Sequence, residues 1–143
     1  MPLQILALWT VFLLGTVFHT QLALIPLFHG LDVMAPHGHQ AATLAEIEPI
    51  LWGMLAFFAL PMVAILATSF NHSRQLRVLH FWMTVLYTVL NIAHLGVDLT
   101  IPPIAWYQIA LMAFLVVVGL LLNWVAYQWA KGARTPAHRL HSA

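Results

Sequence analysis

The sequence predicts an all-α fold, a polytopic membrane protein built as an up-and-down bundle of four transmembrane helices. Of its 143 residues, 62% are hydrophobic and only 6% are charged, whereas about a quarter of the residues of a typical globular protein carry charge. The charged residues also leave four long segments without Asp, Glu, Lys or Arg. Each segment reaches the roughly 20 apolar residues that a helix needs to cross a hydrocarbon core of about 30 Å.

Each of these segments is expected to be a helix, because inside lipid every backbone N–H and C=O group needs a partner within the protein. The expected helices cover about residues 3–28, 50–70, 76–97 and 105–130 of a single domain, 1–143, that ends in a short basic tail, 131–143. The first segment has no Lys or Arg before its apolar run and no convincing small-residue cleavage site after it. We therefore expect it to be retained and not removed as a secretory signal.

Positive charge is confined to the connection between the second and third expected helices and to the C-terminal tail. The basic residues are Arg74, Arg77, Lys131, Arg134 and Arg139. Because Lys and Arg favour cytoplasmic loops, both segments are expected in the cytoplasm, and four crossings then place the N-terminus there too. The other two connections hold all the acids, which are Asp32, Glu46, Glu48 and Asp98. The sequence thus predicts an N-in, C-in topology with an acidic outer face.

Composition excludes several classes of function. The chain has no cysteine, which excludes disulfides, thiolate metal ligands and cysteine nucleophiles. Its few basic residues are too scattered for a nucleic-acid-binding surface, so no nucleic-acid partner is expected. Membrane lipid is the expected environment, and the composition does not distinguish a bacterial-type inner membrane from a thylakoid membrane.

The third expected helix carries a polar stripe along an otherwise apolar span. Residues three or four apart share one helix face, and at this spacing the stripe contains His80, Thr84, Tyr87, Asn91, His94 and Asp98. Ionisable groups inside a membrane almost always face the bundle interior or a wet cavity. The stripe is therefore expected to point toward the other three helices.

His19 in the first helix and His94 in the third are expected at nearly the same depth. At about 1.5 Å per residue, His19 lies roughly 24 Å along its helix and His94 roughly 27 Å along the third. In an up-and-down bundle these two helices run parallel and can face each other across the centre. One hypothesis is that both imidazoles are axial ligands of a b-type haem. The alternative is that each histidine only hydrogen-bonds a neighbouring helix.

A second group of possible ligands is concentrated at the outer end of the bundle. It consists of His29, Asp32, His37 and His39 from one connection together with His94 and Asp98 from the third helix. His94 and Asp98 are four residues apart, so one helix face can present both to a single ion. Imidazoles and carboxylates without thiolates suit zinc, iron, copper, nickel or manganese. We predict a transition-metal or haem site in the extracytoplasmic half.

These histidines and carboxylates favour membrane redox chemistry, such as electron transfer, or metal handling. No nucleophile and base are visibly paired, so the sequence identifies no catalytic residue. Glu46 and Glu48 could still supply acid and base for lipid chemistry at the membrane boundary. Two further classes stay open: a small structural or accessory subunit of a larger membrane complex or homo-oligomer, and a proton-coupled transporter that uses the polar stripe.

Overall fold

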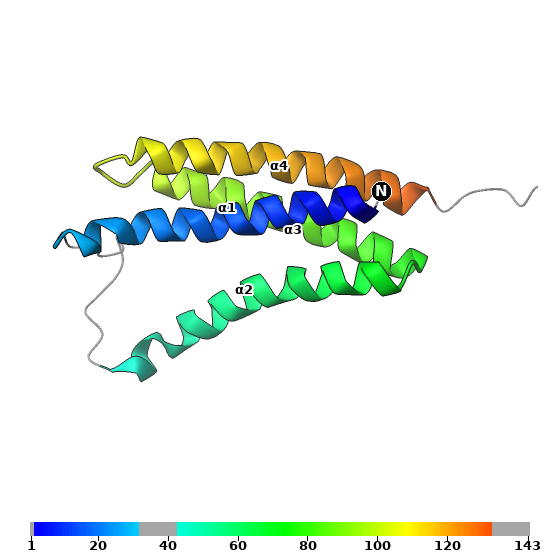
Figure 1. Ribbon diagram of the computed structural model, residues 1–143, viewed down its shortest axis with the longest axis horizontal. Helices are drawn as coiled ribbons and strands as arrows, with labels where there is room; N and C mark the ends of the chain where they lie inside the picture. The colour runs from blue at the N-terminus through cyan, green and yellow to red at the C-terminus, as the bar shows by residue number, and fades with distance from the viewer. Residues whose placement is uncertain (1, 32–42, 133–143) are drawn as a thin grey trace, which may run out of the picture.

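The computed structural model describes residues 2–31 and 43–132, which form four helices that are each long and apolar enough to cross a membrane. The helices are α1 (Pro2–Phe28), α2 (Leu44–Phe70), α3 (Arg74–Asp98) and α4 (Trp106–Lys131). Successive helices run in opposite directions (Figure 1). Contacts join α1 to α2, α2 to α3, α3 to α4 and α4 to α1, while the Cα atoms of α1 and α3 stay more than 8 Å apart. The predicted all-α chain of four such helices is confirmed, with α1 and α3 on one diagonal.

The start of α2 differs from the prediction. The helix begins at Leu44 and not near residue 50, so Pro49 lies inside it. Pro49 is the sixth residue of the helix, so it removes the hydrogen bond that an N–H at this position would donate to the carbonyl of Ala45. Thr43 occupies the N-cap position, and its hydroxyl donates to the carboxylate of Glu46 at 3.1 Å. An acid in the first turn is also stabilised by the helix dipole.

Helix α4 packs closely against α1 and α3 because glycine stands at both contacts. A Cβ atom at Gly15 of α1 would overlap the side chain of Leu115, and one at Gly119 of α4 would lie 2.7 Å from Oγ1 of Thr88. Small residues at such positions let helices approach each other in membrane bundles. The buried hydrophobic residues are Ile5, Trp9, Phe12, Tyr87, Met112, Leu115, Val118, Leu122, Ala126 and Trp129. The core therefore lies mainly between α1, α3 and α4.

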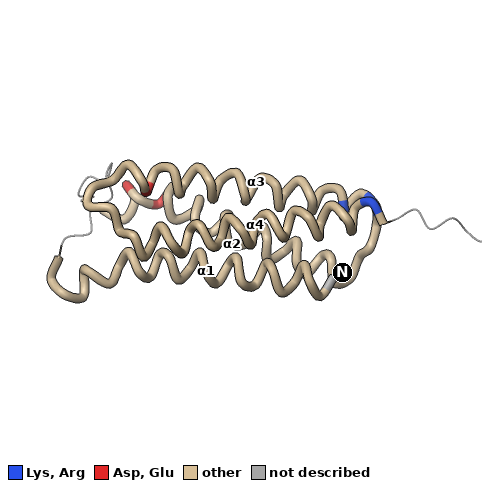
Figure 2. Tube along the Cα trace, turned by 90° about the horizontal axis from the view of Figure 1, so that it is seen from above, with Lys and Arg blue, Asp and Glu red and all other residues tan. Residues whose placement is uncertain are grey.

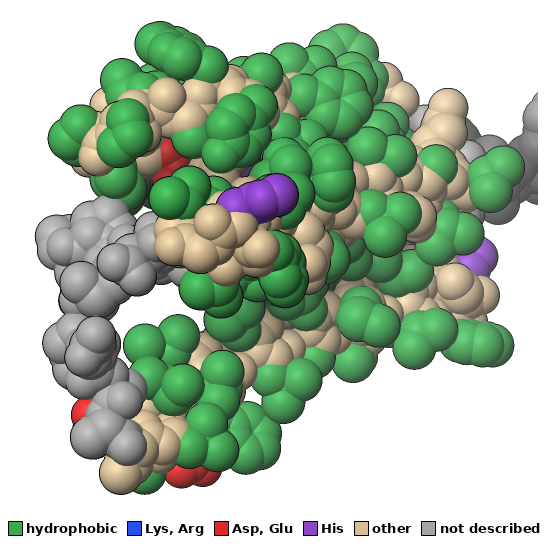
Figure 3. Space-filling model, turned by 60° about the vertical axis from the view of Figure 1, so that its left-hand side comes forward, with side chains coloured by type: hydrophobic (Ala, Val, Ile, Leu, Met, Phe, Trp, Pro, Cys, Tyr) green, Lys and Arg blue, Asp and Glu red, His purple; other side chains and the backbone are tan. Residues whose placement is uncertain are grey.

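Helix α2 is the least buried of the four, and its first half diverges from the rest of the bundle (Figure 1). Pro61 and Thr68 are its buried residues. Between α2 and the other helices lies a cavity of ≈480 Å³. Figure 3 brings forward the end of the molecule where α2 begins. It shows a hollow between α2 and the rest of the bundle, walled mainly by hydrophobic side chains.

One hydrogen bond ties α2 to α3 at a point where proline has interrupted the helix. Pro61 has no N–H, so the carbonyl of Phe57, four residues earlier, loses its intrahelical donor. The hydroxyl of Tyr87 on α3 donates to this carbonyl at 2.6 Å. The bond satisfies the free carbonyl and fixes the position of α2 where its first half begins to diverge.

Charge is segregated between the two ends of the bundle, as Figure 2 shows. Among the described residues, the acidic end carries Glu46, Glu48 and Asp98, and the basic end carries Arg74, Arg77 and Lys131. The start of α1 and the end of α4 both lie at the basic end (Figure 1). This placement agrees with the charge distribution expected from the sequence.

Candidate metal site

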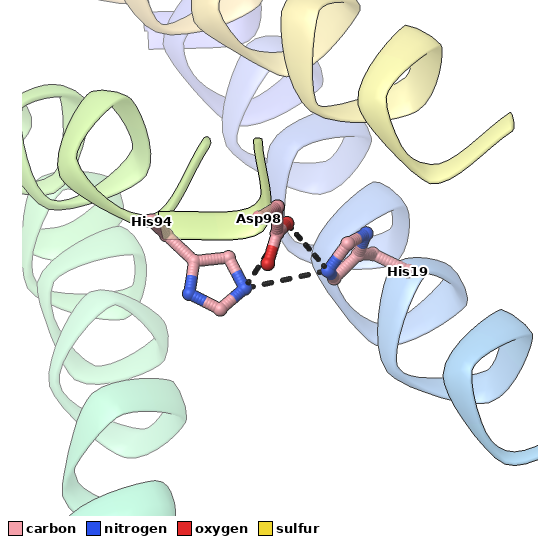
Figure 4. Close-up of side chains that lie close together, drawn as sticks. All are labelled: His19, His94 and Asp98. Carbon is pink, nitrogen blue, oxygen red and sulfur yellow. Dashed lines mark hydrogen bonds and ion pairs between the residues drawn. The ribbon is translucent and has the colours of Figure 1, made fainter. Parts of the chain in front are cut away.

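Three side chains from α1 and α3 converge in the half of the bundle nearer the acidic end (Figure 4). Nε2 of His19 lies 3.3 Å from Nε2 of His94 and 3.5 Å from Oδ2 of Asp98. Nε2 of His94 lies 3.7 Å from the same carboxylate oxygen. We call these residues the His–His–Asp triad.

The helices place the triad by depth and by periodicity. His94 and Asp98 are one turn apart on α3, so both project from one face. His19 reaches them from α1, across the diagonal of the bundle. The side chains of His19 and Asp98 are only 9% and 15% exposed, whereas that of His94 is 55% exposed. A carboxylate in such a poorly solvated position is costly unless a cation or hydrogen-bond donors compensate it.

The dimensions of the triad match three ligands of one metal ion. With metal–ligand bonds of about 2.0–2.2 Å, neighbouring ligand atoms of a tetrahedral site lie about 3.3–3.6 Å apart. The observed separations are 3.3, 3.5 and 3.7 Å. Three protein ligands would leave a fourth position for water or a substrate, which is the arrangement of catalytic and not of structural zinc sites.

A haem held by both histidines fits the triad less well. Axial imidazoles on opposite faces of a porphyrin would place their nitrogen atoms about 4 Å apart, twice a metal–nitrogen bond of about 2 Å, with the macrocycle between them. In the structure, Oδ2 of Asp98 lies close to both Nε2 atoms, in the region that the macrocycle would need. The triad therefore favours a single ion over a haem coordinated by both imidazoles.

Two cavities border residues of the triad. The ≈480 Å³ cavity is bordered by His19 and His94. A smaller cavity of ≈110 Å³ borders Asp98 and Gln108, next to the connection between α3 and α4 at the acidic end. The triad thus borders a mainly apolar cavity and a small cavity whose lining is part polar and part apolar.

The remaining predicted ligands are not part of this cluster. His29 is exposed at the end of α1, and the groups able to hold an ion among residues 2–31 and 43–132 do not include it. Asp32, His37 and His39 lie outside the described residues. The structure thus brings together His19 and His94, which were expected to bind haem, with Asp98, which was expected to bind a metal together with His94.

The polar stripe of α3 points inward, as expected. Its buried members are His80, Thr84, Tyr87 and Asn91. The indole N–H of Trp9 on α1 donates to Nε2 of His80 at 3.1 Å, a second contact across the diagonal that was not predicted from the sequence. Counting residues from the helix ends, which predicted equal depth for His19 and His94, also predicts similar depth for Trp9 and His80. Both lie within two turns of the basic end.

The site offers imidazole nitrogen and carboxylate oxygen, a donor set that suits zinc, copper, nickel or iron. Comparison with protein-family models, with curated proteins and with solved structures finds no significant match to this chain. The chemistry of the site is therefore inferred from its own geometry.

Proposed function

We propose that this chain is an integral membrane protein that binds one transition-metal ion through His19, His94 and Asp98. The four helices of membrane-spanning length support the first part of this proposal. The observation that carries the second part is the triangle of ligand atoms, whose sides of 3.3–3.7 Å fit one tetrahedral ion. The open coordination position supports metal handling or membrane redox chemistry over a purely structural ion.

The separation of acidic and basic residues supports a location of the metal site in the extracytoplasmic half of the bundle. Because Arg and Lys favour the cytoplasm, their place at the basic end supports a triad in the extracytoplasmic half, with both termini inside. The small cavity beside Asp98 and Gln108 lies at the acidic end. Carboxylates at this end attract cations from the aqueous phase.

A proton relay along α3 receives less support than metal binding. A relay needs hydroxyl groups that can exchange protons with their neighbours along the stripe. In the structure, the hydroxyl of Thr84 donates to the carbonyl of Phe81, and that of Tyr87 donates to the carbonyl of Phe57. Both protons are thus committed to backbone acceptors between His80 and the triad.

The test is metal stoichiometry on protein purified in mild detergent, first stripped by a chelator and then loaded with zinc or cobalt(II). We expect about one ion per chain and, for cobalt(II), visible bands typical of four-coordinate geometry. His94→Gln and Asp98→Asn should each lower the affinity by more than about 100-fold, because even losing an outer partner of a metal ligand typically costs about 10- to 100-fold. His94 is half exposed, so its replacement should not prevent folding.

His72→Gln is the matched control, since His72 is exposed and lies at the other end of the bundle. It should bind metal like the unaltered protein. His29→Gln tests the larger site expected from the sequence. If this variant binds the metal ion with unchanged affinity, His29 is not a ligand and the site is limited to the triad. Equal metal binding by the triad variants and the control would refute the proposal. A Soret band in protein made with haem available would show that the protein binds haem, and the proposal of a single ion would then be wrong.

A further inference from the structure

The cavity beside the triad has the properties of a binding site for an organic molecule. Its volume of ≈480 Å³ lies within the range of about 300–1,000 Å³ that is usual for ligand pockets, which are mostly apolar with a few polar groups. Its walls include three aromatic rings, those of Phe12, Phe57 and Phe58. Walls of this kind favour a flat hydrophobic molecule, because aromatic pairs gain energy beyond simple burial.

Asn91 provides a polar anchor in this apolar wall. It borders the cavity and is 7% exposed, yet its amide nitrogen Nδ2 has no hydrogen-bond partner among the described residues. A buried amide without a partner is costly. Rotation about the last side-chain torsion, which has broad preferences in asparagine, can turn the nitrogen toward the cavity. There an acceptor oxygen would satisfy it.

Nδ1 of His19 is a second buried atom without a partner in the described chain, and His19 also borders the cavity. If Nε2 of this imidazole binds the ion, Nδ1 carries the proton and becomes a second donor. Both groups then require acceptors, and neither offers a negative or a positive charge. An uncharged molecule with a carbonyl oxygen is complementary to the amide of Asn91, which borders the cavity.

We propose that this cavity binds a membrane-soluble quinone, with a carbonyl oxygen accepting from the amide of Asn91 beside the triad. The cavity and Asn91 carry the binding itself, whereas any contact with a bound ion rests on the proposed function above. The quinone ring lies among the phenylalanines, and its apolar tail leaves past α2.

Two glycines provide a matched pair of variants. A Cβ atom at Gly53, in the α2 wall of the cavity, would meet nothing within 4 Å, so the backbone there has room for a side chain, and a leucine is chosen to occupy the cavity. Gly96 of α3 is exposed, is equally free of neighbours and does not border the cavity. Both changes replace glycine by a better helix former and should preserve folding.

The experiment measures binding to protein in lipid nanodiscs, with and without zinc, using a benzoquinone that carries a ten-carbon alkyl chain. Decylbenzene, which has the chain and a ring without carbonyl groups, is the comparison ligand. We expect the unaltered protein and Gly96→Leu to bind the quinone alike and Gly53→Leu to lose binding. Asn91→Leu should weaken quinone binding by about fivefold to tenfold and leave decylbenzene unaffected, since one hydrogen bond is removed.

Equal binding of quinone by Gly53→Leu and Gly96→Leu would overturn the proposal, as would equal affinity for the quinone and decylbenzene. A haem found in the cavity would also overturn it. The metal proposal is tested separately in the same samples. Gly53→Leu should retain its ion, and Asp98→Asn should lose its ion while still binding the quinone, so failure of one proposal is distinguishable from failure of the other.

Discussion

Replacing Tyr87 by phenylalanine should destabilise the bundle through the backbone of another helix. The change removes only the hydroxyl that donates to the carbonyl of Phe57 at 2.6 Å. Pro61 denies that carbonyl its usual donor. Tyr87 is 4% exposed and Pro61 is buried, so water does not readily take over the bond. The carbonyl is therefore left unsatisfied inside the bundle.

Two ranges of hydrogen-bond energies bound the loss in free energy of unfolding that we expect for Tyr87→Phe. Leaving a buried acceptor unsatisfied costs about 1–3 kcal/mol, while side-chain hydrogen bonds in a membrane bundle average about 0.6 kcal/mol and reach about 1.7 kcal/mol. A short bond to a carbonyl without an intrahelical donor belongs near the top of the second range. We expect Tyr87→Phe to lower the free energy of unfolding by about 1.5 kcal/mol.

The assay is unfolding by a denaturing detergent in mixed micelles, with Tyr107→Phe as the control because Tyr107 is 55% exposed. A double-mutant cycle isolates the mechanism. Pro61→Ala restores an N–H that can donate to the carbonyl of Phe57. In that background Tyr87→Phe should cost less than half as much as in the unaltered protein. An equal cost in both backgrounds would refute the link between Tyr87 and the missing proline donor.

Two further predictions concern packing and topology. Gly119→Ala should destabilise the fold by about 1–3 kcal/mol, because its Cβ would lie 2.7 Å from a hydroxyl oxygen of α3; an unchanged unfolding midpoint would contradict this packing. The chain has no cysteine, so single cysteines report topology directly. A membrane-impermeant maleimide added to intact cells should label Thr100→Cys and not Gln75→Cys, and the reverse pattern would invert the proposed orientation.

The number of helices could be predicted from the sequence because it depends on local composition. Uncharged runs long enough to cross a membrane specify α1, α3 and α4 to within two residues of their observed ends. The predicted start of α2 is wrong because the uncharged run that defines this helix begins only after Glu48, whereas the helix begins at Leu44. The spacing of Thr43 and Glu46, which is typical of a helix start, could have placed it earlier.

The triad was predictable in part, since equal depth along parallel helices is a matter of counting residues. Counting residues predicted that His19 and His94 lie at the same depth. Helical periodicity predicted that His94 and Asp98 lie on the same face of α3. The sequence could not show that His19 and Asp98 are neighbours, because that depends on the rotation of α1 about its axis. It also could not show the cavity, whose shape depends on how far α2 diverges.

Because α2 is loosely packed, the room in the cavity and the spacing of the triad's ligand atoms depend on different helices. All three ligand atoms of the triad come from α1 and α3, and these two helices are each held firmly by α4. Helix α2 contributes only a wall of the cavity. A change in its tilt, such as a thinner or thicker bilayer imposes, would alter the room for an organic guest while the spacing of the ligand atoms stays constant. Lipid composition would then control the guest without affecting the ion.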